Sequence, residues 1–163
     1  MENSNVNNQK DGVSVVVKPP ILFLAFLILG VALRFMVKLA IFSESSVGYG
    51  YIIGALLILS SASLITWVAK TFKKLGETPH HGKPIHSIMT SGPFQFTRNP
   101  MYLSLTSIYI GLSIIINTYW LLLLLPIMLI ILHYSVILRE EEYLEKKFKD
   151  QYVSYKSQVR RWF

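Results

Sequence analysis

Four long apolar runs decide what this chain can fold into. They cover residues 21–42, 51–69, 101–116 and 119–138. A helix needs about 20 apolar residues to cross a bilayer, and as few as about 17 suffice. The second and fourth runs meet this length, the third is short, and the first carries two basic residues in its second half. The sequence therefore predicts an all-α integral membrane protein with about four transmembrane helices.

The composition supports a membrane location. Hydrophobic residues make up 52% of the chain and charged residues only 15%, against about 25% charged in soluble domains. The 163 residues suit one domain, which we expect over 19–163, behind a polar tail at 1–18 without fixed structure. The tail does not resemble a signal peptide. The absence of cysteine excludes disulfides, thiolate metal sites and cysteine nucleophiles.

The basic residues indicate how the chain is oriented. The formal net charge is +7, and fourteen of the sixteen Lys and Arg lie in the tail, in the 70–98 connection or after residue 138. The positive-inside rule then places both termini and the 70–98 connection in the cytoplasm. The basic excess is thus a topology signal with some attraction to anionic lipids, not a nucleic-acid site. Arg34 and Lys38 are the exceptions, and we expect them to snorkel to the outer surface.

Several other patterns are typical of packing rather than chemistry. The spans lack the carboxylates that a proton-coupled transporter needs, and His133 is expected to be an interhelical hydrogen bonder. Gly48, Gly50 and Gly54 have the spacing of close helix packing and leave dimerisation open. The histidines at 80–86 match no zinc pattern, so no metal is predicted.

The stretch before the third apolar run combines a turn with a helix start. Gly92-Pro93 is turn chemistry, and Arg98-Asn99-Pro100 predicts a helix with Asn at the cap and Pro in the first turn. A helix N-terminus beside an arginine suits an anion such as a carboxylate. A juxtamembrane turn with a snorkelling Arg98 is the alternative.

The segment after the fourth apolar run predicts a cytoplasmic helix over 139–157. Its apolar stripe recurs at helical spacing, at Leu144, Phe148, Tyr152 and Tyr155. Glu140 and Glu141 lie on or beside this stripe, where a carboxylate needs a cationic partner. That partner is either intrachain, Arg98 or Arg139, or a cationic ligand that nearby aromatic rings would also attract.

The two segments together resemble a known enzyme family. The patterns are His86-x-x-Met89-Thr90-Ser91-Gly92-Pro93-Phe94, then Arg98-Asn99-Pro100-Met101-Tyr102-Leu103, then Glu140-Glu141-x-x-Leu144-x-x-x-Phe148-x-x-x-Tyr152-x-x-Tyr155 and Arg160-Arg161-Trp162. They resemble the isoprenylcysteine carboxyl methyltransferases and their bacterial relatives, within a wider phospholipid methyltransferase-like superfamily. The resemblance covers about residues 70–162.

The resemblance implies an integral membrane methyltransferase that uses S-adenosylmethionine in a cytoplasmic-side pocket and takes a lipophilic acceptor from the bilayer. Arg98 would orient an anionic group, Glu140 would meet the cofactor's ammonium, and Glu141 would be the base for an amine acceptor. Of the two acids, the resemblance favours Glu140. The cofactor-binding residues that it implies are His86, Met89, Thr90, Gly92, Pro93, Phe94, Asn99, Pro100, Tyr102, Leu103 and Glu140.

Two departures leave the acceptor open. Asn99 stands where the prenylcysteine enzymes carry His, and Phe94 replaces a common Tyr. We expect a carboxylate acceptor, with an amine lipid headgroup as the alternative and a non-catalytic membrane binding protein as a second one. Partners would be lipids and a lipidated or lipophilic substrate, without nucleic acid; the sequence does not set the oligomeric state. The expected location is a bacterial inner membrane, with endoplasmic reticulum as the alternative.

Overall fold

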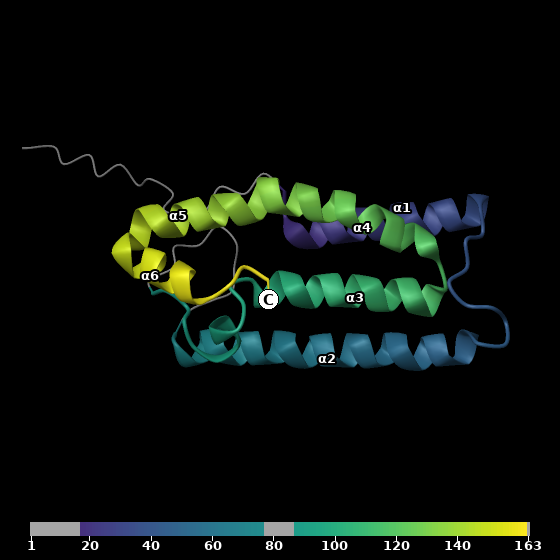
Figure 1. Cartoon of the computed structure of the whole chain (residues 1–163), viewed down its shortest axis with the longest axis horizontal. Helices are drawn as coiled ribbons and strands as arrows, with labels where there is room; N and C mark the ends of the chain where they lie inside the picture. Colours follow the sequence, from purple (N-terminus) through teal and green to yellow (C-terminus); the bar gives the residue numbers. More distant parts are fainter. Residues whose placement is uncertain (1–16, 77–86, 163) are drawn as a thin grey trace, which may run out of the picture.

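The computed structural model describes residues 17–76 and 87–162, and every regular element in this part of the chain is a helix (Figure 1). Three helical stretches are long and apolar enough to cross a membrane: Pro19–Met36, Val47–Lys74 and Tyr119–Phe148. The helix Pro100–Ile116 is apolar but shorter. The predicted class, an all-α membrane protein with about four spans, is confirmed.

The long helices pack as two pairs. Helix α2 (Val47–Lys74) lies along α3 (Pro100–Ile116), and α1 (Pro19–Met36) lies along α4 (Tyr119–Leu132), as Figure 1 shows. Tyr109 of α3 joins the pairs, because its ring meets Phe23 of α1 edge to face at 6.2 Å. Much of the remaining surface of α1, α2 and α4 is exposed leucine, isoleucine and aromatic side chain, as a lipid-facing surface requires.

Two glycines bring α2 and α3 close together. A Cβ on Gly54 would lie 2.8 Å from the carbonyl oxygen of Gly111, and a Cβ on Gly111 would lie 3.0 Å from that of Gly54. Gly50 packs against the Phe42 ring, whereas Gly48 has no neighbour within 4 Å of an added Cβ. The predicted packing role therefore holds for Gly54 and Gly50 but is wrong for Gly48.

The turn between α3 and α4 organises one end of the bundle. Asn117 adopts the left-handed conformation with φ 54° and ends α3, and Thr118 caps α4 by accepting from the Trp120 N–H. The Asn117 side chain accepts from the backbone N–H groups of Ile41 and Phe42 at 2.8 and 2.7 Å. Segment 37–46 is thereby fastened to this turn.

The first span is shorter than predicted. Helix α1 ends at Met36 and Val37 is extended, so residues 37–42 are not helical as the predicted run 21–42 required. Arg34 was expected to extend to the membrane surface, but its guanidinium donates a hydrogen bond to the Asn117 carbonyl. Lys38 lies beyond the helix, so the two basic residues do not share a helical face.

The fourth helix extends past the predicted span, and the C-terminal helix is broken. Helix α4 continues through a π-helical turn, His133–Ile137, into α5 (Leu138–Phe148). At 1.5 Å per residue, about 20 residues from Tyr119 already cross the hydrocarbon core, so α5 lies beyond it.

Lys149, at φ 47°, separates α5 from α6 (Asp150–Gln158). The prediction of a single helix over 139–157 is therefore wrong.

We predict that Gly54→Ala destabilises the bundle by about 1–3 kcal/mol, because the new methyl group meets a backbone oxygen that cannot move aside. Gly48→Ala is the matched control on the same helix and should stay within about 1 kcal/mol of wild type, on the stabilising side. Thermal unfolding in mild detergent measures both. Equal stability of the two variants would contradict the packing role of Gly54.

Candidate functional site

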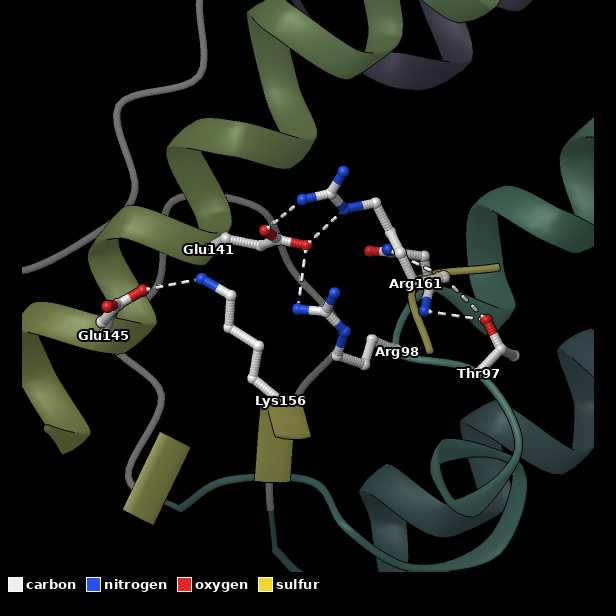
Figure 2. A network of polar contacts seen from close by, with 7 residues as sticks. Thr97, Arg98, Glu141, Glu145, Lys156 and Arg161 are labelled. Carbon is white, nitrogen blue, oxygen red and sulfur yellow. Dashed lines mark hydrogen bonds and ion pairs between the residues drawn. The ribbon is translucent and has the colours of Figure 1, made fainter. Parts of the chain in front are cut away.

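The two sequence motifs meet at one end of the bundle, where α3 begins and α5 leaves α4 (Figure 2). The carboxylate of Glu141 lies at the centre and is 6% exposed. Arg161 binds it with two hydrogen bonds, from Nε and from Nη2, each 2.8 Å long. Arg98 reaches the same carboxylate with Nη1 at 3.1 Å from Oε1. One buried acid thus joins both motifs to the C-terminal segment.

The π-helical turn explains why Glu141 points inward. Leu121, Met128 and Leu132 are buried at α-helical spacing on α4, and continued spacing would bring residue 140 to the same face. In the turn, the Leu138 N–H donates to the His133 carbonyl, five residues back. This accommodates one extra residue, so that Ile137 is buried beside Val136 and Glu141 lies on the inward face one turn later.

Glu140 faces the start of α3. Its Oε1 accepts a hydrogen bond of 2.8 Å from the Tyr102 hydroxyl, and Tyr102 is itself buried. The two acids therefore differ in their partners: Glu140 meets a phenol, while Glu141 meets two guanidinium groups. Of the intrachain salt bridges considered from the sequence, the one between Glu141 and Arg98 is confirmed.

A C-terminal strap, residues 159–162, lies across the start of α3. The Arg98 N–H donates to the Arg160 carbonyl at 3.0 Å. The Arg161 carbonyl accepts from Thr97 Oγ1 at 3.0 Å and from Asn99 Nδ2 at 3.2 Å. Asn99 is the N-cap residue of α3, as predicted, but its side-chain amide is hydrogen-bonded to the strap and does not cap the helix.

The Gly92-Pro93 turn is packed against α2 and α6. It forms a short 3₁₀ helix, η1 (Gly92–Gln95), and Gly92 has φ 62°, as the turn chemistry predicted. A Cβ on Gly92 would come within 2.7 Å of Thr71 Oγ1 on α2. On the other side, the Tyr155 hydroxyl donates to the Phe94 carbonyl at 2.7 Å. The turn thus fastens the C-terminal helices to the bundle.

An open groove lies beside Glu141, between α5 and α6. Its volume is about 390 Å³. Two ion pairs line it, Lys156 with Glu145 at 3.1 Å and Lys146 with Glu142 at 2.6 Å. Its walls are formed by Leu138, Glu141, Glu142, Glu145, Lys146 and Lys156. The groove therefore runs from an apolar residue at the end of the span to a charged, partly acidic rim.

The charges around Glu141 keep it ionised. Burial alone would raise its pKa, but the hydrogen bonds from Arg161 and the positive charges of Arg98, Arg161 and Lys156 outweigh burial and lower it. The hydrogen bonds to Glu141 raise the pKa of Arg161. The Arg98 side chain is 9% exposed, and its Nε and Nη1 make no hydrogen bond within the described residues. Nη1 is nevertheless paired with the Glu141 carboxylate at 3.1 Å, so among the described residues Nε is the Arg98 donor that neither a hydrogen bond nor this ion pair uses.

The structure brings together part of the predicted site. Arg98, Asn99, Tyr102, Glu140 and Glu141 meet around the start of α3. Two other predicted residues lie on α3 itself: Pro100 is buried at its start, and Leu103 is half-buried. The rest lie at or near η1, where Met89 and Pro93 are buried, Phe94 packs on Phe72, and Thr90 is exposed. His86, the histidines at 80 and 81, and most of the predicted tail lie outside the described residues.

The sequence analysis missed Thr97, Lys156 and Arg161 as parts of this cluster. Arg161 belongs to the Arg160-Arg161-Trp162 pattern that carried the resemblance, so the signal was present. The pattern alone could not show that its second arginine meets Glu141.

Comparison with known proteins gives two findings. A family model described as phospholipid methyltransferase matches residues 49–151, which include all but the first two residues of α2, the whole of α3, α4 and α5, and most of both motifs. A protein of Haemophilus influenzae, described as uncharacterized, is 40% identical over 62 residues, which are 38% of this chain and 98% of that protein. No solved structure matches the chain.

We predict that Glu141→Gln lowers the stability near neutral pH by about 3 kcal/mol, because two guanidinium groups lose their buried partner. The folded-state pKa of Glu141 lies below its ordinary value of 4.5. The stability that it adds is therefore present above about pH 4.5 and is lost as the pH falls through the lower folded-state pKa.

Melting temperatures of wild type and variant, measured from pH 7 down to pH 3, should therefore differ most at pH 7 and converge at low pH. Glu142→Gln is the control, since Glu142 forms an exposed ion pair with Lys146 and should leave the melting temperature unchanged. A constant difference across the pH range would contradict the assignment of the charge to Glu141.

Proposed function

The chain belongs to the phospholipid methyltransferase family, and on that basis we propose that it transfers the methyl group of S-adenosylmethionine to a lipophilic acceptor at the membrane surface. The observation that carries this proposal is the cluster in which Glu140, Glu141 and Arg98 join both sequence motifs. The cluster lies beside a groove of about 390 Å³ whose lining includes Leu138, where the fourth helix passes from its apolar to its charged part.

The chemistry of the cluster fits both charges of the proposed cofactor. S-adenosylmethionine carries a sulfonium, an ammonium and a carboxylate. Glu140 and the acids of the groove suit the cations, and the Tyr102 ring beside Glu140 could add cation–π attraction. The carboxylate suits the nearby N-terminus of α3. When bound, the cofactor supplies an electrophilic methyl group.

We favour a carboxylate acceptor of the isoprenylcysteine type. Two guanidinium groups surround a single carboxylate at Glu141, so an additional anion near Arg98 would meet an excess of positive charge. Alkylation of a carboxylate needs no general base. The contribution of the chain is then to align the acceptor and to exclude water at the end of the bundle.

An amine lipid headgroup is the second candidate acceptor. The family description itself favours a phospholipid, and three glutamates line the groove, where they would attract an ammonium. An ammonium must lose a proton before it can accept a methyl group. The lowered pKa of Glu141 makes it a weak base. The amine acceptor, which would need Glu141 as its base, is therefore less favourable than the carboxylate acceptor, which would be oriented by Arg98.

We further propose that the end of the bundle with the cluster faces the cytoplasm, with both chain termini on that side. Figure 1 shows that α2 ends, α3 begins and α5 and α6 lie at this end. Exposed basic residues gather there, at Lys73, Lys74, Arg139, Lys146, Lys147 and Arg160, as the positive-inside rule requires. A bacterial inner membrane is the proposed location, with endoplasmic reticulum as the alternative.

We predict that the detergent-purified protein binds S-adenosylhomocysteine and that Glu140→Ala weakens this binding at least about tenfold, through loss of a charge-assisted hydrogen bond. Isothermal calorimetry measures both affinities. Glu44→Ala, at the opposite end of the bundle, is the matched control and should bind like wild type. Absence of binding at millimolar ligand would refute the proposal. Binding without methyl transfer would instead indicate an inactive binding protein on the same scaffold.

The acceptor class can be read from the stability of the product. After incubation with methyl-labelled cofactor and membrane lipids, a methyl ester releases its label in mild base, whereas an N-methyl group retains it. We expect label that is lost in base. Base-stable label on a phospholipid headgroup would instead establish the amine acceptor.

A further inference from the structure

The C-terminal strap, residues 159–162, places a cation where a cationic ligand would be expected to bind. Arg161 satisfies both oxygens of Glu141 with hydrogen bonds of 2.8 Å. Figure 2 shows its guanidinium on one side of the carboxylate and that of Arg98 on the other. Glu141 also lines the groove between α5 and α6. A ligand in this groove can therefore reach Glu141 only in competition with Arg161.

The two arginines are held very differently. The Arg98 side chain is 9% exposed, whereas that of Arg161 is 31% exposed. Arg161 can therefore be hydrated when it leaves the carboxylate, and Arg98 cannot without structural change. If Arg161 leaves, Glu141 and Arg98 remain as a pair of one negative and one positive charge. Displacement of Arg161 thus leaves no buried charge without a partner, which would be costly.

The strap has few other attachments. Its backbone is held by the N–H of Arg98 and by the side chains of Thr97 and Asn99, and Trp162 packs against the buried core. It follows α6 outside any regular element, since that helix ends at Gln158. Apart from the Arg161–Glu141 pair, docking of the strap thus rests on three hydrogen bonds to its backbone and on the Trp162 contact.

We propose that the strap is an internal competitor: Arg161 occupies Glu141 in the free protein, and the cationic part of an incoming ligand displaces it. The cation would be the ammonium of an S-adenosylmethionine-type ligand, whose three N–H donors can serve Glu141 as well as Glu140, so the inference rests on the proposed function. It adds a regulatory contact at the same site, in which ligand binding and docking of the strap exclude each other.

The test compares two adjacent arginines. Arg161→Ala removes the competing cation, and Arg160→Ala removes an exposed neighbour whose backbone carbonyl accepts the Arg98 N–H. Affinity for S-adenosylhomocysteine is measured by calorimetry on the full chain in detergent. We expect Arg161→Ala to bind about tenfold more tightly than wild type, equivalent to about 1.4 kcal/mol, and Arg160→Ala to bind like wild type.

Hydrogen exchange supplies a readout that does not depend on the ligand. The Arg98 amide donates to the strap, so it should exchange faster in Arg161→Ala than in wild type or Arg160→Ala. Weaker binding by Arg161→Ala, with wild type still binding, would overturn the competition and show that Arg161 helps to build the site. If neither wild type nor Arg161→Ala binds, the proposed function fails. Arg161→Lys, which keeps the charge, should bind no more tightly than wild type and controls for loss of folding.

Discussion

Glu141 is a carboxylate that water scarcely reaches, so its charge must be balanced from within the protein. Arg98 at the start of α3 and Arg161 in the C-terminal strap provide that balance. The three residues come from segments far apart in the sequence. Their mutual attraction therefore fixes how α5, the start of α3 and the chain's last residues lie relative to one another, and the groove beside them depends on this arrangement.

The helix pairs below the cluster determine where it can form. Gly54 and Gly111 hold α2 close to α3, and the turn at Asn117 holds α3 beside α4 at the opposite end. The π-helical turn at His133–Ile137 then keeps the buried face of α4 continuous with Glu141 on α5. Close packing, a fastened turn and one additional residue in the helix together bring the acid opposite Arg98.

The sequence could predict the elements that depend on local composition. Apolar runs predicted the spans, and the Gly92-Pro93 pair predicted a turn. It could not predict features that depend on tertiary contacts. The end of α1 at Met36 follows from the fastening of segment 37–46 to Asn117, and the break at Lys149 requires a positive φ that lysine rarely adopts. Helical spacing placed both acids near the buried stripe, but it could not show that Glu140 meets Tyr102 while Glu141 meets two arginines.

The reaction that we propose, between a water-soluble cofactor and a lipophilic acceptor, needs a place where both can arrive. Among the described acidic residues, only Glu44 lies away from segment 140–150, which directly follows the apolar fourth helix. The groove spans that same transition, from Leu138 at the end of the span to Lys156 on α6. Charges of both signs can persist there because they neutralise one another, whereas deeper in the bilayer each would face hydrocarbon. The membrane boundary is thus the part of this fold in which a charged cofactor and an apolar acceptor could meet.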